Sequence, residues 1–132
     1  MKIVYLIARI LLGLVFLVFG LNGFLHFLPN PPLPTGPAGQ FVVALSESHY
    51  MIVVFVVQLI GAIGLLFNQY VPLALTLLGP VVVNIILFHA FMAPSGLPMA
   101  MITAILWVVA AHQVRSSFAG LLQQRVPTDN FD

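Results

Sequence analysis

The sequence predicts an all-α integral membrane protein built as a four-helix bundle, and two observations carry this prediction. Hydrophobic residues make up 61% of the chain and charged residues only 5%, whereas ordinary soluble domains are about 25% charged. The apolar residues also gather in four long stretches, each near the roughly 17–25 residues that cross a bilayer as a helix. Continuous apolar runs of this length exclude transmembrane strands, which alternate in polarity over about 10 residues.

The four predicted spans are residues 3–28, 50–67, 71–93 and 97–114. The connections between them are short, so we expect one four-helix domain over residues 1–119 and a polar tail over residues 120–132. We do not expect the first span to be a cleaved secretory signal, because its apolar stretch is longer than the roughly 7–15 residues of a signal core.

Only four basic residues set the predicted orientation. Lys2 and Arg9 begin the first span, and the other two, Arg115 and Arg125, follow the last span. The positive-inside rule therefore places both termini in the cytoplasm, as an even number of spans requires. We expect Arg9 to snorkel to the cytoplasmic edge and orient the protein. The net charge of +1 is too small to indicate nucleic-acid binding.

A proline-rich loop between the first two spans is predicted to face outward. Residues 29–40, PNPPLPTGPAGQ, contain five prolines, which prevent a regular helix. Residues 40–48 are too apolar for open solvent and too few to span, so they predict a short interfacial helix or a lid on the bundle. In the third span Pro80 predicts a kink, and Thr76 is expected to help satisfy the freed carbonyl region.

Polar side chains inside the predicted spans form the candidate ligand site. Helical geometry of about 100° per residue puts Asn22 and His26 on one face of the first span. Gln58 lies on a glycine-bearing seam of the second span, while Asn84 and His89 are about 140° apart on the third. From a rise of about 1.5 Å per residue, we expect all five to converge in a chamber near the outer surface, under the proline-rich loop.

Structural explanations compete with this functional one. Amides in membrane helices often do no more than hydrogen-bond across a helix seam, so both explanations stay open for the five residues. His49 and His112 are expected to be boundary residues, and Trp107 to pack in the membrane. Small residues on a helix face let a neighbouring backbone approach closely. A packing role is therefore expected of the glycines, in addition to the orienting role of Arg9 and the kink at Pro80. The residues with expected structural or orienting roles are Arg9, Gly13, Gly20, Gly23, Gly61 and Pro80.

The chemistry that such a chamber supports is binding rather than metal or thiol chemistry. The chain has no cysteine and only one acidic residue before its tail, so no metal site is expected. An apolar chamber with imidazole and amide donors suits a quinone headgroup, whose carbonyl oxygens accept hydrogen bonds. Haem ligated by histidine is the weaker alternative, because no facing pair of histidines is evident.

Several segments together carry a family resemblance. They are ARILLGLVFLVFGLNGFLHFLP (8–29), the PPLP loop, QLIGAIGLLFNQYVPLALTLLGP (58–80), VVVNIILFHAF (81–91) and PSGLP (94–98). These segments, which cover most of the chain, resemble the DoxX-like family of small four-span membrane proteins. The resemblance implies a multi-pass protein of the bacterial cytoplasmic (inner) membrane, associated with quinone oxidoreductases or redox-stress complexes.

The resemblance also bears on single positions. The residues carried over are Arg9, Asn22, His26, Gln58, Asn84 and His89. The family commonly has glutamate where this chain has Gln58, so a protonatable group is neutral here. This departure favours binding or scaffolding over a proton-coupled mechanism.

From these observations we expect a component of a membrane redox system that binds a quinone or a similar small ligand. The alternative is a non-catalytic accessory subunit that packs on a larger membrane protein complex. A small transporter is the weaker third reading, because four helices leave little lumen. The expected partners are the lipid bilayer and other membrane subunits, and no catalytic residue is assigned.

Overall fold

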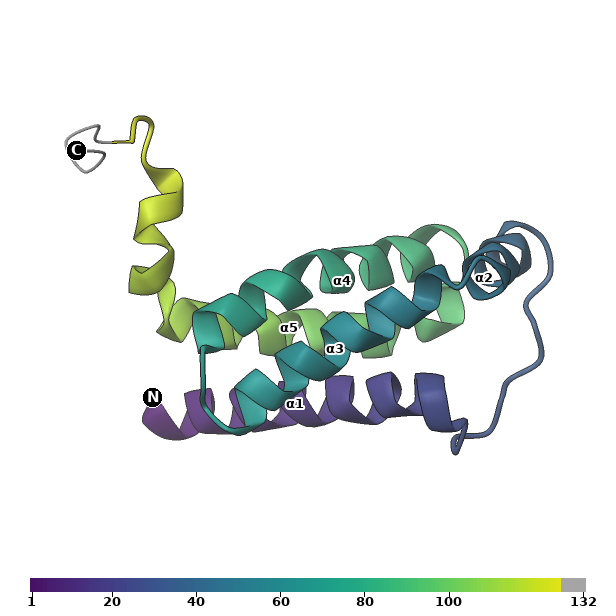
Figure 1. Ribbon diagram of the computed structural model, residues 1–132, viewed down its shortest axis with the longest axis horizontal. Helices are drawn as coiled ribbons and strands as arrows, with labels where there is room; N and C mark the ends of the chain where they lie inside the picture. The colour runs from purple at the N-terminus through teal and green to yellow at the C-terminus, as the bar shows by residue number, and fades with distance from the viewer. Residues whose placement is uncertain (127–132) are drawn as a thin grey trace.

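The computed structural model describes residues 1–126, and the regular structure within them is entirely helical. The chain order is α1 (Lys2–Leu25), α2 (Pro37–Glu47), α3 (Tyr50–Leu66), α4 (Val71–Phe91), η1 (Pro94–Gly96), α5 (Leu97–Gln113) and η2 (Arg115–Leu122), where η marks a 3-10 helix. Helices α1, α3, α4 and α5 run along a common axis, and α2 lies across one end (Figure 1). The all-α prediction is confirmed.

Length and composition indicate a membrane protein. Three helical stretches are long and apolar enough to cross a bilayer: α1, α4 and residues Pro94–Gln113, which contain α5. Helix α3 has 17 residues and meets α2 at a bend of 83°, so this pair is a fourth candidate span. Large apolar side chains are exposed on every long helix, for example Ile7, Val53, Val83 and Ile105. Such a surface suits lipid, because soluble monomers rarely expose large apolar patches.

The four long helices pack as a ring. Helix α1 packs against α3 and α5, and α4 packs against the same two helices. Fully buried side chains from α1, α3 and α4 fill the centre: Leu12, Phe16, Leu65, Leu75 and Leu78. These side chains pack closely against one another, and the many weak dispersion contacts between them together stabilise the bundle.

Glycines on α1 allow the close approach of α3. A Cβ on Gly13 would lie 2.9 Å from the side chain of Leu66, and one on Gly20 would lie 3.0 Å from that of Leu59. A Cβ on Gly23 would likewise clash with the ring of Phe55. On α3, a Cβ at Gly61 would lie 2.6 Å from Leu78 of α4, so a small residue is needed on this face as well. The glycines predicted to pack therefore lie at helix contacts.

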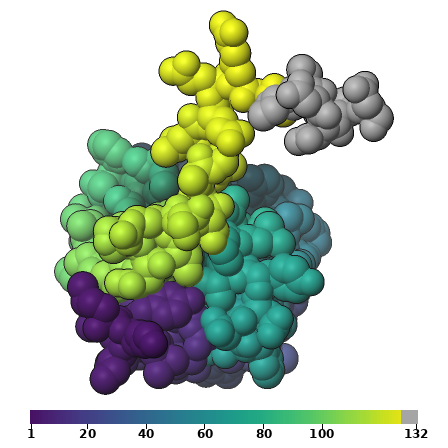
Figure 2. Space-filling view, turned by 90° about the vertical axis from the view of Figure 1, so that its left-hand side faces the viewer, coloured from purple at the N-terminus to yellow at the C-terminus, as the bar shows by residue number. Residues whose placement is uncertain are grey.

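The two ends of the bundle differ. The start of α1 and η2 lie at one end, whereas α2 and the proline-rich loop lie at the other (Figure 1). Seen end-on, η2 projects away from the bundle (Figure 2). Of the predicted polar tail, residues 120–122 belong to η2, and residues 127–132 lie outside the described part of the chain.

Helix α2 is the short helix that residues 40–48 predict, but it starts earlier, at Pro37. Gly36 precedes it with φ 69°, a conformation that glycine adopts without strain. A Cβ on Gly39 would collide with the carbonyl oxygen of Pro34, so glycine at this position lets the loop approach the helix closely. The Phe41 ring lies 5.6 Å from the Phe88 ring of α4. Helix α2 is thereby held against the end of the bundle.

Helix α4 continues through Pro80 without a break, and the hydrogen bonds around it differ from expectation. The Thr76 hydroxyl donates to the carbonyl of Pro72, 2.8 Å away, and so does not serve the carbonyls near the proline. Instead, the Trp107 indole N–H of α5 donates to the Leu75 carbonyl at 2.9 Å. Trp107 therefore links two helices as well as packing between them.

Candidate functional site

Gln58 is the polar residue that the fold encloses most completely among the five predicted ligand contacts. It lies on the inner face of α3 together with Gly61, Ala62 and Leu65, and only 6% of its surface is exposed. Its amide oxygen has no hydrogen-bond partner among residues 1–126. A buried polar atom without a partner costs about 1–3 kcal/mol, so this amide is a candidate for binding something that supplies the missing bond.

A cavity of about 130 Å³ lies beside this amide. All four long helices contribute to its wall, which consists of Val15, Phe16, Phe19, Gln58, Ile85, Met99, Ala100 and Thr103. The Thr103 hydroxyl donates to the Met99 carbonyl of its own helix at 3.0 Å and is thus already engaged. The remaining wall is apolar apart from backbone, so the Gln58 amide supplies the directional interaction in this cavity.

The cavity has the size and polarity of a site for a small ring. A cavity of about 150 Å³ in another protein binds benzene, so about 130 Å³ is comparable to one six-membered ring. An amide both donates and accepts hydrogen bonds. Gln58 is therefore suited to a ring that carries either a carbonyl or a hydroxyl group.

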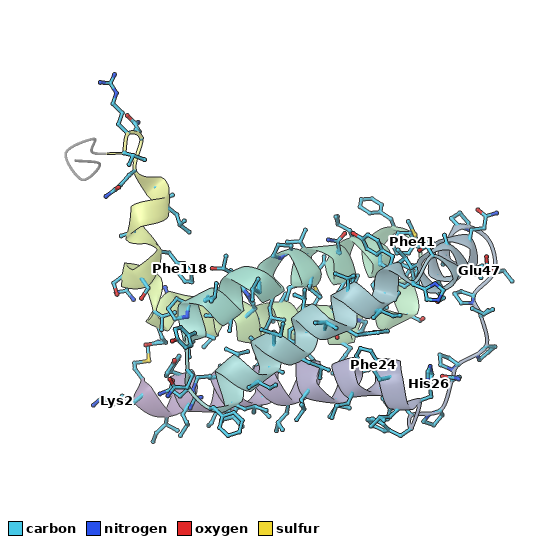
Figure 3. The ribbon with its side chains drawn as sticks, in the orientation of Figure 1. Lys2, Phe24, His26, Phe41, Glu47 and Phe118 are labelled. Atoms are coloured by element: carbon cyan, nitrogen blue, oxygen red, sulfur yellow. The ribbon has the colours of Figure 1, made fainter. Side chains whose placement is uncertain are left out.

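Two of the predicted site residues end α1 instead of lining this cavity. The Asn22 side-chain oxygen accepts a hydrogen bond from the Leu28 N–H at 2.8 Å. His26 is exposed, has φ 52°, and donates its backbone N–H to the Asn22 carbonyl. In Figure 3, His26 lies where the loop leaves α1. The helix therefore ends at Leu25, three residues before the predicted boundary, and the His26 imidazole projects from the loop.

The two predicted site residues of α4, Asn84 and His89, lie apart from each other and outside this cavity. Asn84 is exposed on the outside of the bundle and donates its side-chain N–H to the Pro80 carbonyl of its own helix at 2.8 Å. His89 is half-buried, and its Nδ1 lies 3.1 Å from the Ala93 carbonyl. The 140° between them makes this separation unavoidable on one helix. Of the five residues expected to meet in one chamber, Gln58 alone lines the cavity.

Arg9 does not snorkel to the membrane edge as the sequence suggested. Its side chain is only 6% exposed, and one guanidinium nitrogen donates to the Leu65 carbonyl at the end of α3. The guanidinium carbon lies 5.8 Å from the centre of the Tyr5 ring, within range of a cation–π contact. A cation is stabilised at a helix C-terminus, where carbonyls lack helical donors, so Arg9 acts as a clamp between α1 and α3.

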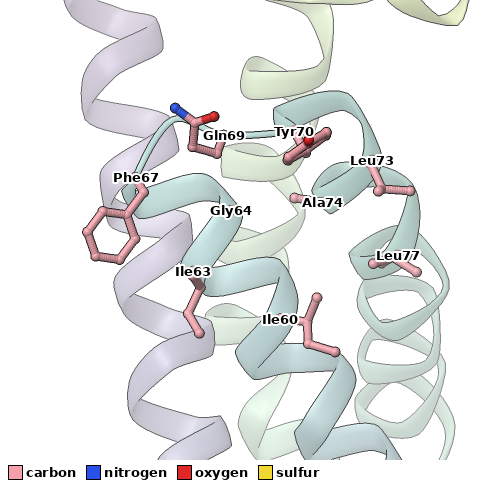
Figure 4. Close-up of a pocket in the computed structure, with 9 residues that line it drawn as sticks. All are labelled: Ile60, Ile63, Gly64, Phe67, Gln69, Tyr70, Leu73, Ala74 and Leu77. Carbon is pink, nitrogen blue, oxygen red and sulfur yellow. The ribbon is translucent and has the colours of Figure 1, made fainter.

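A larger hollow lies on the outside, between the end of α3 and the start of α4 (Figure 4). Its volume is about 380 Å³, and its wall is Ile60, Ile63, Gly64, Phe67, Gln69, Tyr70, Leu73, Ala74 and Leu77. Most of these side chains are apolar, and none is a buried polar group without a partner. The outer hollow is therefore as apolar as a lipid-facing surface. The smaller cavity at Gln58 is the better candidate for specific binding.

The sequence identified Gln58 but missed the rest of its cavity. Ala100, Thr103 and Ala110 are buried on one face of α5, and their spacing of three and seven residues is a helical pattern. That pattern could have indicated Thr103 as an inward-facing residue. Among residues 1–126, no three His, Asp or Glu side chains group as metal ligands. Comparison of the chain with family models, curated proteins and solved structures gives no match.

Proposed function

We propose that this membrane protein binds a quinone, or a similar small ligand with an apolar body and a hydrogen-bonding head, in the cavity at Gln58. The observation that carries the proposal is the unpartnered amide oxygen of a side chain that is 6% exposed. The amide N–H would donate to a quinone carbonyl, and the amide oxygen would accept from the hydroxyl of the reduced form. One side chain can thus hold both redox states.

The cavity wall also supports a ligand with an apolar tail. Phe19 of α1 and Met99 of α5 line the cavity and are each 45% exposed. A chain attached to the ring could leave between these two neighbouring helices and enter the surrounding lipid. Because Gln58 is neutral and does not titrate, the proposed role is binding and delivery, with no proton transfer by this side chain.

The proposed setting follows the predicted orientation and the family resemblance. Both termini would lie in the cytoplasm, with α2 on the outer side of a bacterial inner membrane. The chain would then work as a DoxX-like component of a membrane redox system, passing quinone to a partner enzyme. The alternative role is an accessory subunit on a larger complex, in which a different protein would cover the exposed amide of Asn84 on α4, because polar groups inside a membrane usually face protein.

A quenching experiment tests the binding proposal. Trp107 is the only tryptophan and follows Thr103 by four residues, about 6 Å along α5. A short-chain quinone titrated into protein in lipid nanodiscs should therefore quench its fluorescence saturably. Replacing Gln58 with Leu removes one hydrogen bond, worth about 0.5–1.5 kcal/mol, and should weaken binding about two- to tenfold.

The matched control is His26→Ala, which removes an exposed imidazole at the end of α1. This variant should bind the quinone as the parent protein does. Equal affinity of the parent and the Gln58→Leu variant, or quenching that never saturates, would remove the basis of the proposal.

A further inference from the structure

The outer face of α4 carries a line of polar atoms at membrane depth. Thr76, Pro80 and Asn84 follow each other at intervals of four residues and are all exposed. Residues four apart lie on the same helix face. Asn84 is seven residues from the end of α4 at Phe91, which corresponds to about 10 Å along the axis. It therefore lies within the hydrocarbon if α4 crosses the bilayer.

Hydrogen-bonding capacity remains open along this line. Asn84 donates one side-chain N–H to the Pro80 carbonyl, which leaves its second N–H and its oxygen available. The Thr76 hydroxyl donates to Pro72 and retains acceptor capacity. Pro80 has no N–H, so the backbone carbonyl of Thr76 lacks its usual helical donor. Hydrocarbon supplies no hydrogen-bond partner, so this face is costly when it borders lipid.

The open groups on Asn84 are self-complementary. Two copies of one chain share the same orientation in a membrane, so a two-fold axis along the membrane normal brings identical residues together at the same depth. Two facing amides can then exchange N–H and oxygen in both directions. Val83 and Leu87, which are 54% and 47% exposed, flank Asn84 and would supply apolar contacts.

We propose that a second copy of this chain covers the outer face of α4, with Asn84 opposite its counterpart at the centre of the contact. This dimer is independent of the proposed ligand, because Asn84 does not line the Gln58 cavity. The cavity wall toward lipid is formed by α1 and α5 residues, so dimerisation through α4 leaves that side open. A ligand-free protein should therefore dimerise as well.

The absence of cysteine from the chain makes disulfide cross-linking a clean test. Leu87→Cys places a thiol beside Asn84 while keeping the amide. In liposomes at high lipid-to-protein ratio, mild oxidation should give a cross-linked dimer. The control is Val18→Cys, because Val18 is exposed and lies on α1, outside the proposed contact. We expect several-fold less cross-linking from this control.

Changes at Asn84 separate a specific contact from random collision. In the Leu87→Cys background, Asn84→Leu should weaken dimerisation about 3- to 30-fold, the range that interhelical polar contacts support. Asn84→Gln keeps an amide and should retain more dimer than Asn84→Leu. Cross-linking that equals the Val18→Cys control, or that Asn84→Leu leaves unchanged, would overturn the proposal. So would a monomer in liposomes that cross-links to a different protein in native membranes.

Discussion

At the scale of single residues, Arg9 joins α1 to α3 through a side-chain hydrogen bond. Its guanidinium donates to the Leu65 carbonyl, which also accepts a long bond of 3.4 Å from the Asn68 N–H. The Nε atom is buried and has no partner among the described residues. The charge is thus stabilised by the negative end of α3 and by the Tyr5 ring.

We predict that Arg9→Met destabilises the fold by about 1.5–3 kcal/mol, the range for a hydrogen bond to a charged group. Unfolding in mixed micelles with increasing denaturing detergent, followed by circular dichroism, measures this loss. Lys2→Met is the matched control, because Lys2 is an exposed cation on the same helix and should change stability by less than about 0.5 kcal/mol. Similar losses from both variants would show that Arg9 contributes only general charge.

Residue positions were predictable where helical spacing decides them. Gln58 and Gly61 were placed on an inner seam by periodicity, and both are buried. The turn at His26 was not predictable in this way, because Phe27 and Leu28 continue the apolar run in the sequence. The bond from the Leu28 N–H to Asn22 closes the helix earlier than hydropathy indicates, so a capping contact prevailed over composition.

At the scale of elements, the contact between α4 and α5 includes an interhelical hydrogen bond near Pro80. Trp107 donates to the Leu75 carbonyl at 2.9 Å, in the turn just before the proline. The indole also covers Gly79, where an added Cβ would lie 3.3 Å from the ring. The Leu75 carbonyl directly precedes that of Thr76, which Pro80 leaves without its helical donor, so the indole adds a bond between the helices and does not replace the missing one.

We predict that Trp107→Phe, which keeps an aromatic ring but removes the donor, destabilises the protein by about 0.5–1.5 kcal/mol. The matched control is Thr76→Val on α4, because the Thr76 hydroxyl bonds only within its own helix. We expect this control to retain nearly the stability of the parent protein in the same detergent unfolding measurement. Equal stability of Trp107→Phe and the parent would mean that the bond contributes nothing.

The order and type of the elements could be predicted from the sequence, but their contacts could not. The short α3–α4 connection was expected from the predicted spans at residues 50–67 and 71–93, and α4 begins at Val71 with Pro72 in its first turn, a position that suits proline. Helix α2 was expected either as a short interfacial helix or as a lid on the bundle. Its bend of 83° to α3 and the Phe41–Phe88 contact depend on tertiary packing, which periodicity does not report.

At the scale of the whole molecule, the ring of four helices decides which polar residues can meet. Asn84 lies on the outside of α4, His26 projects from the end of α1, and Gln58 points inward. Depth along the helices had suggested a common chamber, but depth alone does not determine direction. The rotation of each helix about its axis, set by the glycine and leucine contacts, separates these side chains.

We propose that a quinone binds in the Gln58 cavity and not in the larger hollow between α3 and α4. Photolabelling with a light-activated quinone, followed by mass spectrometric mapping of the modified residues, tests this most directly. Labels on Phe19, Ile85 or Met99, which line the cavity, are the predicted result. Labels on Ile60, Leu73 or Leu77, which line the outer hollow, with the cavity residues unmodified, would contradict the claim.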